Sequence, residues 1–151
     1  MRSRTAQWFE CKIKYEKVQE DGTQKKVTEQ YVVNAMSFAE AEARITEEMS
    51  AYISGEFTVE DVKKAPYGEI FFSDDADNDR FYKVKLDFIT IDEKTEKEKR
   101  SRVTYLVQAT NLNRAMRNVD TVMGGTMIDY DAASISDTKL VDVFETMEQR
   151  E

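Results

Sequence analysis

Apolar and polar side chains alternate along residues 8–18 of this chain. Phe9, Cys11, Ile13 and Tyr15 fall on one side of an extended backbone, and charged residues separate them. Such period-two alternation is typical of a half-buried strand. Asp21-Gly22 then favours a tight hairpin turn, and a second strand is predicted over about 26–36. The pattern therefore predicts a β-hairpin at the start of the chain.

A helix is predicted to begin at Ser37. Ser37 and Glu40 have the spacing of a capping box. Apolar residues follow at helical spacing, namely Ala41, Ile45, Met49 and Tyr52. Gly55 favours the end of the helix. An extended segment over about 57–72 comes next, and Pro66 predicts a bend, a bulge or an edge position within it.

The same order of elements is predicted for the second half. Alternation at positions 82–88, a polar loop at 92–100 and a strand at 102–110 predict another hairpin. Asn111 takes the cap position of the second helix. The apolar stripe of that helix consists of Leu112, Ala115, Val119 and Val122 or Met123.

Two glycines, Gly124 and Gly125, are expected to end the second helix, and a final strand is predicted over about 132–145. A phosphate-binding role for the glycine pair is disfavoured. Phosphate loops precede a helix, where the amides point outward, whereas this pair follows one.

Three short segments of the first half return in the second half, in the same order and at nearly the same spacing. The matched segments are 8–13 with 81–86, 31–35 with 105–109, and 69–71 with 142–144. We interpret them as a tandem duplication within one compact domain. The first β-β-α-β repeat covers residues 1–73 and the second covers residues 74–151.

These patterns predict an α+β fold. We expect one mainly antiparallel sheet with both helices on the same face, related by a pseudo-twofold axis. Two small sheets packed side by side are the alternative arrangement.

From the composition we expect a soluble, cytoplasmic protein. Of the 151 residues, 34% are charged, and the formal net charge is −8. No apolar stretch is long enough to cross a membrane. One cysteine, Cys11, excludes an internal disulfide and fits a reducing compartment.

The chain contains no histidine, which is the commonest general base and metal ligand. Zinc sites and Ser-His-Asp triads are therefore excluded. We predict a protein that is not an enzyme and that binds no metal or cofactor. Glu69 and Asp142 match across the repeat and could in principle act as an acid–base pair. No nucleophile and base occur at a spacing that supports such a catalytic role.

An acidic run between the halves resembles the start of a calcium loop. Asp75, Asp77 and Asp79 have the right spacing. The match then fails, because Arg80 stands where glycine is needed and Leu86 where the bidentate glutamate is needed. We expect a solvated acidic linker or long turn over residues 73–79 instead.

The polar side of the predicted sheet holds the candidate binding residues. Aromatic rings flanked by lysines resemble the platforms that stack bases or nucleotides. The residues are Trp8, Lys12, Lys14, Phe81, Lys83 and Lys85. Three interpretations stay open: a ligand platform, an oligomer interface and an ordinary charged surface.

The segments Val27-Thr28-Glu29 and Tyr105-Leu106-Val107, together with the length of the chain, resemble an uncharacterised family. That family is a domain of unknown function from Bacteroides-type bacteria and their phages. The resemblance implies a cytoplasmic accessory protein of a phage or mobile element, and it implies no catalytic residue.

Our leading functional hypothesis is a non-enzymatic binding or adaptor protein, forming a homo-oligomer and working through a sheet face or edge. Its expected partner is a host protein or a small anionic, nucleotide-like ligand, and not a membrane. A nucleic-acid-binding module and a structural or assembly component are the alternatives. The negative charge opposes nucleic-acid binding.

Overall fold

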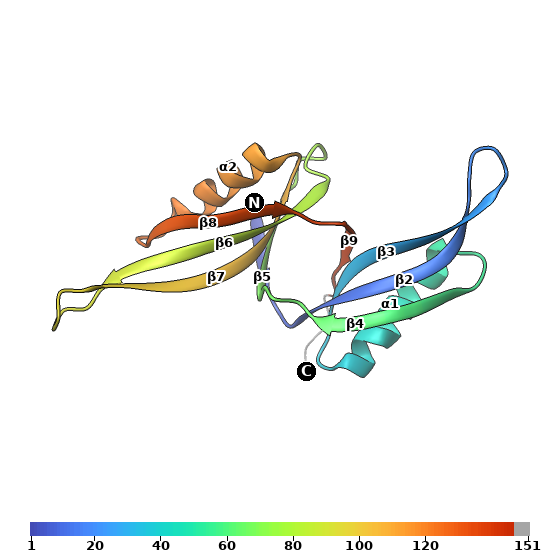
Figure 1. Ribbon diagram of the computed structural model, residues 1–151, viewed down its shortest axis with the longest axis horizontal. Coiled ribbons are helices and arrows are strands. Elements are labelled where there is room, and N and C mark those ends of the chain that lie inside the picture. The colour runs from blue at the N-terminus through green and yellow to red at the C-terminus, as the bar shows by residue number, and fades with distance from the viewer. Residues whose placement is uncertain (147–151) are drawn as a thin grey trace. The chain divides into compact units, whose positions relative to one another are not determined.

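The computed structural model describes residues 1–146, and this part of the chain forms two helices and nine strands in two sheets. Both sheets are mixed and mainly antiparallel, so the fold is α+β. The chain divides into two compact units (Figure 1). Unit 1 consists of residues 1–5 and 66–138, and the described part of unit 2 consists of residues 6–65 and 139–146.

Unit 2 contains a four-stranded sheet in the order β4-β2-β3-β9. Its antiparallel strands are β2 (Trp8–Val18), β3 (Gln24–Asn34) and β4 (Phe57–Lys64). The strand β9 (Leu140–Phe144) comes from the far end of the chain and runs parallel to β3. Helix α1 (Phe38–Tyr52) covers one face of this sheet (Figure 1).

Unit 1 contains a five-stranded sheet in the order β1-β5-β7-β6-β8. Its hairpin is formed by β6 (Arg80–Ile91) and β7 (Glu98–Ala109), and helix α2 (Leu112–Met123) packs on it. The strand β8 (Asp129–Asp137) lies beside β6. The short strand β5 (Glu69–Phe72) runs parallel to β7, and β1 (Arg2–Thr5) lies outside β5.

Each unit has a core between its own sheet and helix. In unit 2 the alternating side chains of β2 meet the stripe of α1, and the shared residues are Phe9, Cys11, Ile13, Ala41, Ile45 and Met49. In unit 1 the corresponding side chains are Val84, Leu86, Val107, Val119 and Met123. Burial of one face of a sheet against one stripe of a helix is what the sequence pattern predicted.

The local signals of the sequence are confirmed. Gly22 adopts a left-handed φ of 86° in the turn between β2 and β3. The Ser37 side chain accepts a hydrogen bond from the Glu40 amide, and the Glu40 carboxylate accepts one from the Met36 amide. Asn111 caps α2 through the Arg114 amide at 2.8 Å, and Gly124 is the C-cap residue.

The prediction of one sheet with both helices on one face was wrong. Each helix instead covers its own sheet, which corresponds to the alternative of two sheets. The two long segments predicted at 57–72 and 132–145 each split into two strands that join different sheets. Pro66 lies at the first split, where a residue without an amide hydrogen cannot continue a ladder. The strand β1 has no counterpart among the elements predicted from the sequence.

Candidate functional site

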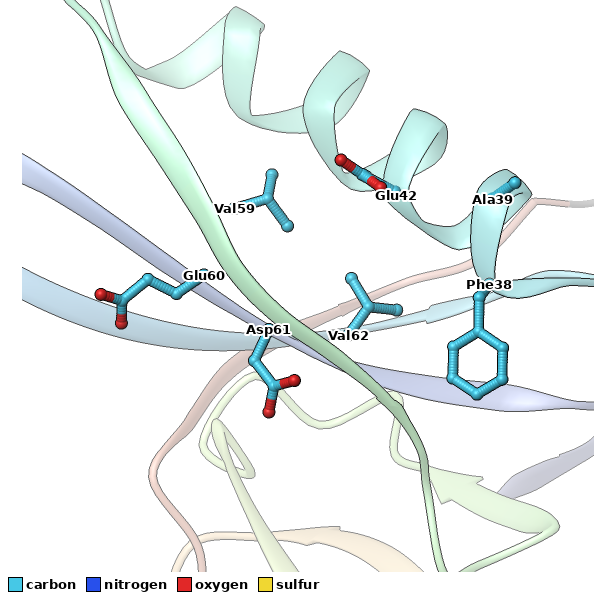
Figure 2. Close-up of a pocket in the computed structure, with 7 residues that line it drawn as sticks. All are labelled: Phe38, Ala39, Glu42, Val59, Glu60, Asp61 and Val62. Carbon is cyan, nitrogen blue, oxygen red and sulfur yellow. The ribbon is translucent and has the colours of Figure 1, made fainter.

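A groove of about 480 Å³ opens between α1 and the edge strand β4 of unit 2 (Figure 2). It is lined by Phe38, Ala39, Glu42, Val59, Glu60, Asp61 and Val62. A second hollow adjoins it along α1 and shares Ala39 and Glu42, adding Ala43, Thr46 and Glu47. We name the two hollows together the α1–β4 groove.

A β-bulge shapes the strand side of the groove. The register between β2 and β4 shifts between Lys12 and Ile13, which pair with Asp61 and Val59, so Glu60 is the extra residue. Because of this extra residue, Val59 and Val62 both face α1, while Glu60 and Asp61 point away from it (Figure 2). The bulge thus places two valines inside the groove and two carboxylates on its outer rim.

The start of α1 forms the other side. Phe38 is the first helical residue and is 52% exposed, with its ring edge-on to Phe9 at 5.1 Å between centroids. Ala39 and Ala43 are exposed one turn apart, so this side of α1 carries short side chains next to an apolar ring. An exposed aromatic ring beside a free strand edge is a feature of protein-binding surfaces.

The α1–β4 groove is acidic. Its lining contains the carboxylates of Glu42, Glu47, Glu60 and Asp61 and contains no lysine or arginine. Glu60 makes an ion pair with Lys14 at 3.7 Å, and both side chains of that pair are well exposed. Exposed pairs of this kind are weak and exchange readily, so the groove favours a cationic occupant over an anionic one.

The corresponding place in unit 1 differs. There the hydroxyl of Tyr130 on β8 donates a hydrogen bond of 2.6 Å to Asp120 on α2, which ties the edge strand to the helix. The bond to Asp120 raises the pKa of Tyr130 to about 12. The extra residue in the bulge of β8 is the uncharged Ala133.

The two aromatic residues of the predicted platform are buried. Trp8 on β2 is 2% exposed and Phe81 on β6 is 3% exposed. Rings this deeply buried do not present a face on which a base can stack. Each lies on the face of its sheet opposite the helix, as the alternation predicted.

The four lysines of the platform lie on two different sheets. Lys12 and Lys14 belong to β2 of unit 2, and Lys83 and Lys85 belong to β6 of unit 1. Lys14 is exposed and the other three are half-buried. Lys12 lines a small hollow of about 60 Å³ together with Glu10, Gln30, Asp61 and Lys63. No single sheet brings the predicted binding residues together.

The two carboxylates that match across the repeat belong to different units. Glu69 is paired in register with Tyr105 in unit 1, and Asp142 with Tyr31 in unit 2. Cys11 is buried, and desolvation, with smaller contributions from Asp61 and Glu10, raises the pKa of its thiol to about 12. A thiol in this state is a poor nucleophile.

The acidic run forms a compact turn rather than an extended linker. The Asp75 amide donates to Ser73 Oγ at 3.0 Å, the Asp77 amide donates to Asp75 Oδ1 at 2.9 Å, and Asn78 is buried. Within residues 1–146, no group of three or more acidic or cysteine side chains is arranged to hold a metal ion.

The α1–β4 groove was missed by the sequence analysis, although one signal for it is present. Val59 and Val62 are three residues apart, which breaks the period-two alternation of a regular strand and indicates a bulge. That β4 is an edge strand has no local signal, because it depends on which strands pair with it.

The chain was compared with protein families, with curated proteins and with solved structures. A family model described as a domain of unknown function, DUF4494, matches residues 7–146. No curated protein and no solved structure matched the chain. Among the described residues, no helix is both long enough and apolar enough to cross a membrane. Since the family model covers nearly the whole length, the chain belongs to the DUF4494 family of domains of unknown function.

Proposed function

We propose that this protein is a non-enzymatic adaptor that binds another protein through the α1–β4 groove. The observation that carries the proposal is an exposed phenylalanine, Phe38, beside an edge strand and a rim of carboxylates. The absence of histidine from the sequence and the burial of Cys11 support a role without catalysis.

A protein partner fits this groove better than a small anionic ligand, because the lining side chains carry only negative charge. The nucleic-acid alternative has less support for the same reason, and because Trp8 and Phe81 are buried. Following the family resemblance, we place the adaptor in the cytoplasm of a bacterial host, as a phage or mobile-element protein whose partner is a host protein. Self-association into a homo-oligomer is part of the same proposal.

Phe38→Asp tests the proposal, with Leu112→Asp as its matched control. Each residue is the first of its helix and directly follows the N-cap residue. Phe38 is 52% exposed and Leu112 is 48% exposed. Aspartate is well tolerated in the first turn of a helix. Proteins that co-purify with the tagged protein from its native host are quantified by mass spectrometry. We expect a specific partner to be kept by Leu112→Asp and reduced at least tenfold by Phe38→Asp. An unchanged set of partners in Phe38→Asp would contradict the proposal.

We also propose that the two units derive from a tandem duplication. The bulges support this, since they interrupt pairing at Lys12/Ile13 in one unit and at Lys85/Leu86 in the other. Side-chain amides at equivalent positions add support. Asn34 accepts a hydrogen bond from the Thr146 amide after β9, and Gln108 accepts one from the Ser73 amide after β5. A specialised groove in one unit then reflects divergence of the copies.

A further inference from the structure

We propose that the α1–β4 groove takes an extended, lysine- or arginine-rich segment of the partner, which pairs with β4 as an additional strand. This inference rests on the proposed adaptor function and deepens it by naming the chemistry and the conformation of the bound segment.

The first support is the position of β4 at the edge of its sheet. In the described part of unit 2, β4 pairs with β2 on one side and with no strand on the other. Alternate residues of an edge strand direct their amide and carbonyl groups outward, where they form a template for another strand. Extended peptides bind many proteins by strand addition of this kind.

The second support is the space beside that edge. A strand added to β4 would direct every second side chain toward α1, where Phe38, Ala39 and Ala43 leave room. Aliphatic parts of those side chains would pack on the Phe38 ring and on Val62. Long cationic side chains suit such a site, because their methylene groups cover apolar surface while their charged ends remain solvated.

The third support is charge on both faces of the added strand. Side chains directed toward α1 would meet Glu42, and those on the opposite face would meet Glu60 and Asp61. On that opposite face Glu60 is weakly paired with the exposed Lys14, and Asp61 shares a small hollow with Lys12 and Lys63. Lysine or arginine is therefore favoured at successive positions. An acidic segment would be repelled by Glu42 on the face toward α1, which gives the groove its selectivity.

The other edge-and-helix pair of the molecule serves as an internal comparison. In unit 1, the Tyr130–Asp120 hydrogen bond ties β8 to α2, and the residues around the bulge of β8 are Ala132, Ala133 and Ser134. The bulge of β8 itself thus carries no carboxylate, although Asp129, Asp131 and Asp137 lie elsewhere on that strand. We therefore expect a basic segment to choose β4 rather than β8.

The test uses the full-length protein and a labelled octapeptide in which pairs of lysines alternate with pairs of valines, so that both faces of the extended peptide carry lysine. It is carried out at about 50 mM salt, where surface charges are weakly screened. The control peptide has glutamate in place of lysine. We expect the basic peptide to bind, the acidic peptide not to bind, and affinity to fall as salt is raised. Absence of binding by the basic peptide would overturn the inference. The proposed function would stand or fall separately, on the partner comparison with Phe38→Asp.

Two N-methylated peptides test whether the backbone pairs. One carries methyl groups on the amides of the odd positions and the other on the even positions. In a paired strand, only alternate amides point at the neighbouring strand, so one peptide should lose binding and the other should keep it. Equal binding of the two peptides would contradict strand addition.

Protein variants locate the site. Glu42→Gln, Glu60→Gln and Asp61→Asn together remove three charges from the groove, and we expect about tenfold weaker binding. Asp74→Asn, Glu93→Gln and Asp129→Asn remove three exposed charges from unit 1 and should change affinity less than about twofold. Equal loss in both variants would contradict the assignment.

Sedimentation of the same proteins shows whether a second copy occupies the edge. A dimer that only the groove variant dissociates would overturn the inference.

Discussion

Cys11 carries the one thiol of the chain and lies among the apolar side chains between β2 and α1. The apolar neighbours exclude water from the sulfur, and the carboxylates of Asp61 and Glu10 lie close enough to disfavour a further negative charge on it. Both effects act in the same direction, with desolvation the larger, so the thiol stays protonated in the folded protein.

The reactivity of Cys11 gives a prediction at the scale of one residue. A rise in the pKa from 9.0 to about 12 lowers the thiolate fraction near neutral pH roughly a thousandfold. We expect a disulfide-exchange reagent to label the native protein at least a thousandfold more slowly than the protein in urea. Equal rates with and without urea would contradict the burial of this thiol.

At the scale of elements, charged pairs across strands join the outer half of the sheet in unit 1. Asp87 on β6 accepts hydrogen bonds from Arg102 on β7, at 2.8 Å to Nε and 3.2 Å to Nη2. Arg100 on β7 lies 3.8 Å from Asp87 and 3.1 Å from Asp131 on β8. These contacts link the three neighbouring strands β7, β6 and β8.

Asp87→Asn should flatten the pH dependence of stability. The hydrogen bonds from Arg102, followed by the charges of Arg102 and Arg100, hold the pKa of Asp87 below its usual value of 3.8. As the pH falls, the unfolded chain therefore binds this proton before the folded protein does. The stabilisation is present above pH 4 and is lost as the pH falls through the lowered pKa.

Urea unfolding measured from about pH 6 to pH 2.5 checks this prediction. The free energy of unfolding should decline more steeply in the wild type than in Asp87→Asn at the acidic end. Asp74→Asn removes one exposed carboxylate from the turn before β6 and serves as the control. Identical slopes in the wild type and Asp87→Asn would show that the Asp87 pair is not maintained in solution.

At the scale of the whole molecule, the order of elements along the chain differs from their order in space. The strand β5 follows β4 in sequence but lies in unit 1, and β9 follows β8 but lies in unit 2. Each helix-covered hairpin is thus completed by a parallel strand. The strand β9 comes from a distant part of the sequence, whereas β5 shortly precedes its hairpin. Neither unit is a continuous segment of the chain.

Phe144→Ala and Phe71→Ala test this arrangement as a reciprocal pair. The ring of Phe144 on β9 stacks on that of Tyr31 on β3, with 5.4 Å between the ring centroids. The rings of Phe71 on β5 and Tyr105 on β7 have their centroids 4.8 Å apart. We expect a loss of stability of about 2 kcal/mol for the half-buried Phe144 and about 3 kcal/mol for the buried Phe71.

Hydrogen exchange distinguishes the two variants. Phe144→Ala should lower the protection of amides in β2 and β3, although these strands lie more than a hundred residues away in sequence. Phe71→Ala should lower the protection of β6 and β7 instead. If Phe144→Ala weakened β8 and left β3 unchanged, the assignment of β9 to unit 2 would be wrong.

The sequence by itself determined the local structure. The turn at Gly22, the caps at Ser37 and Asn111 and the buried faces of β2 and β6 all follow from residues within a few positions of one another. Alternation and helical spacing report which side of an element is apolar, and that information is local.

The tertiary structure alone decided which strands pair, and with them the site. A four- or five-residue apolar strand such as β5 or β9 fits equally well beside several neighbours, so its partner depends on the burial of the whole chain. The same dependence placed Trp8 and Phe81 out of reach of solvent, separated the lysines of the predicted platform and left β4 at an edge. An edge strand is defined by the neighbour that it lacks, and no pattern within its own residues records that.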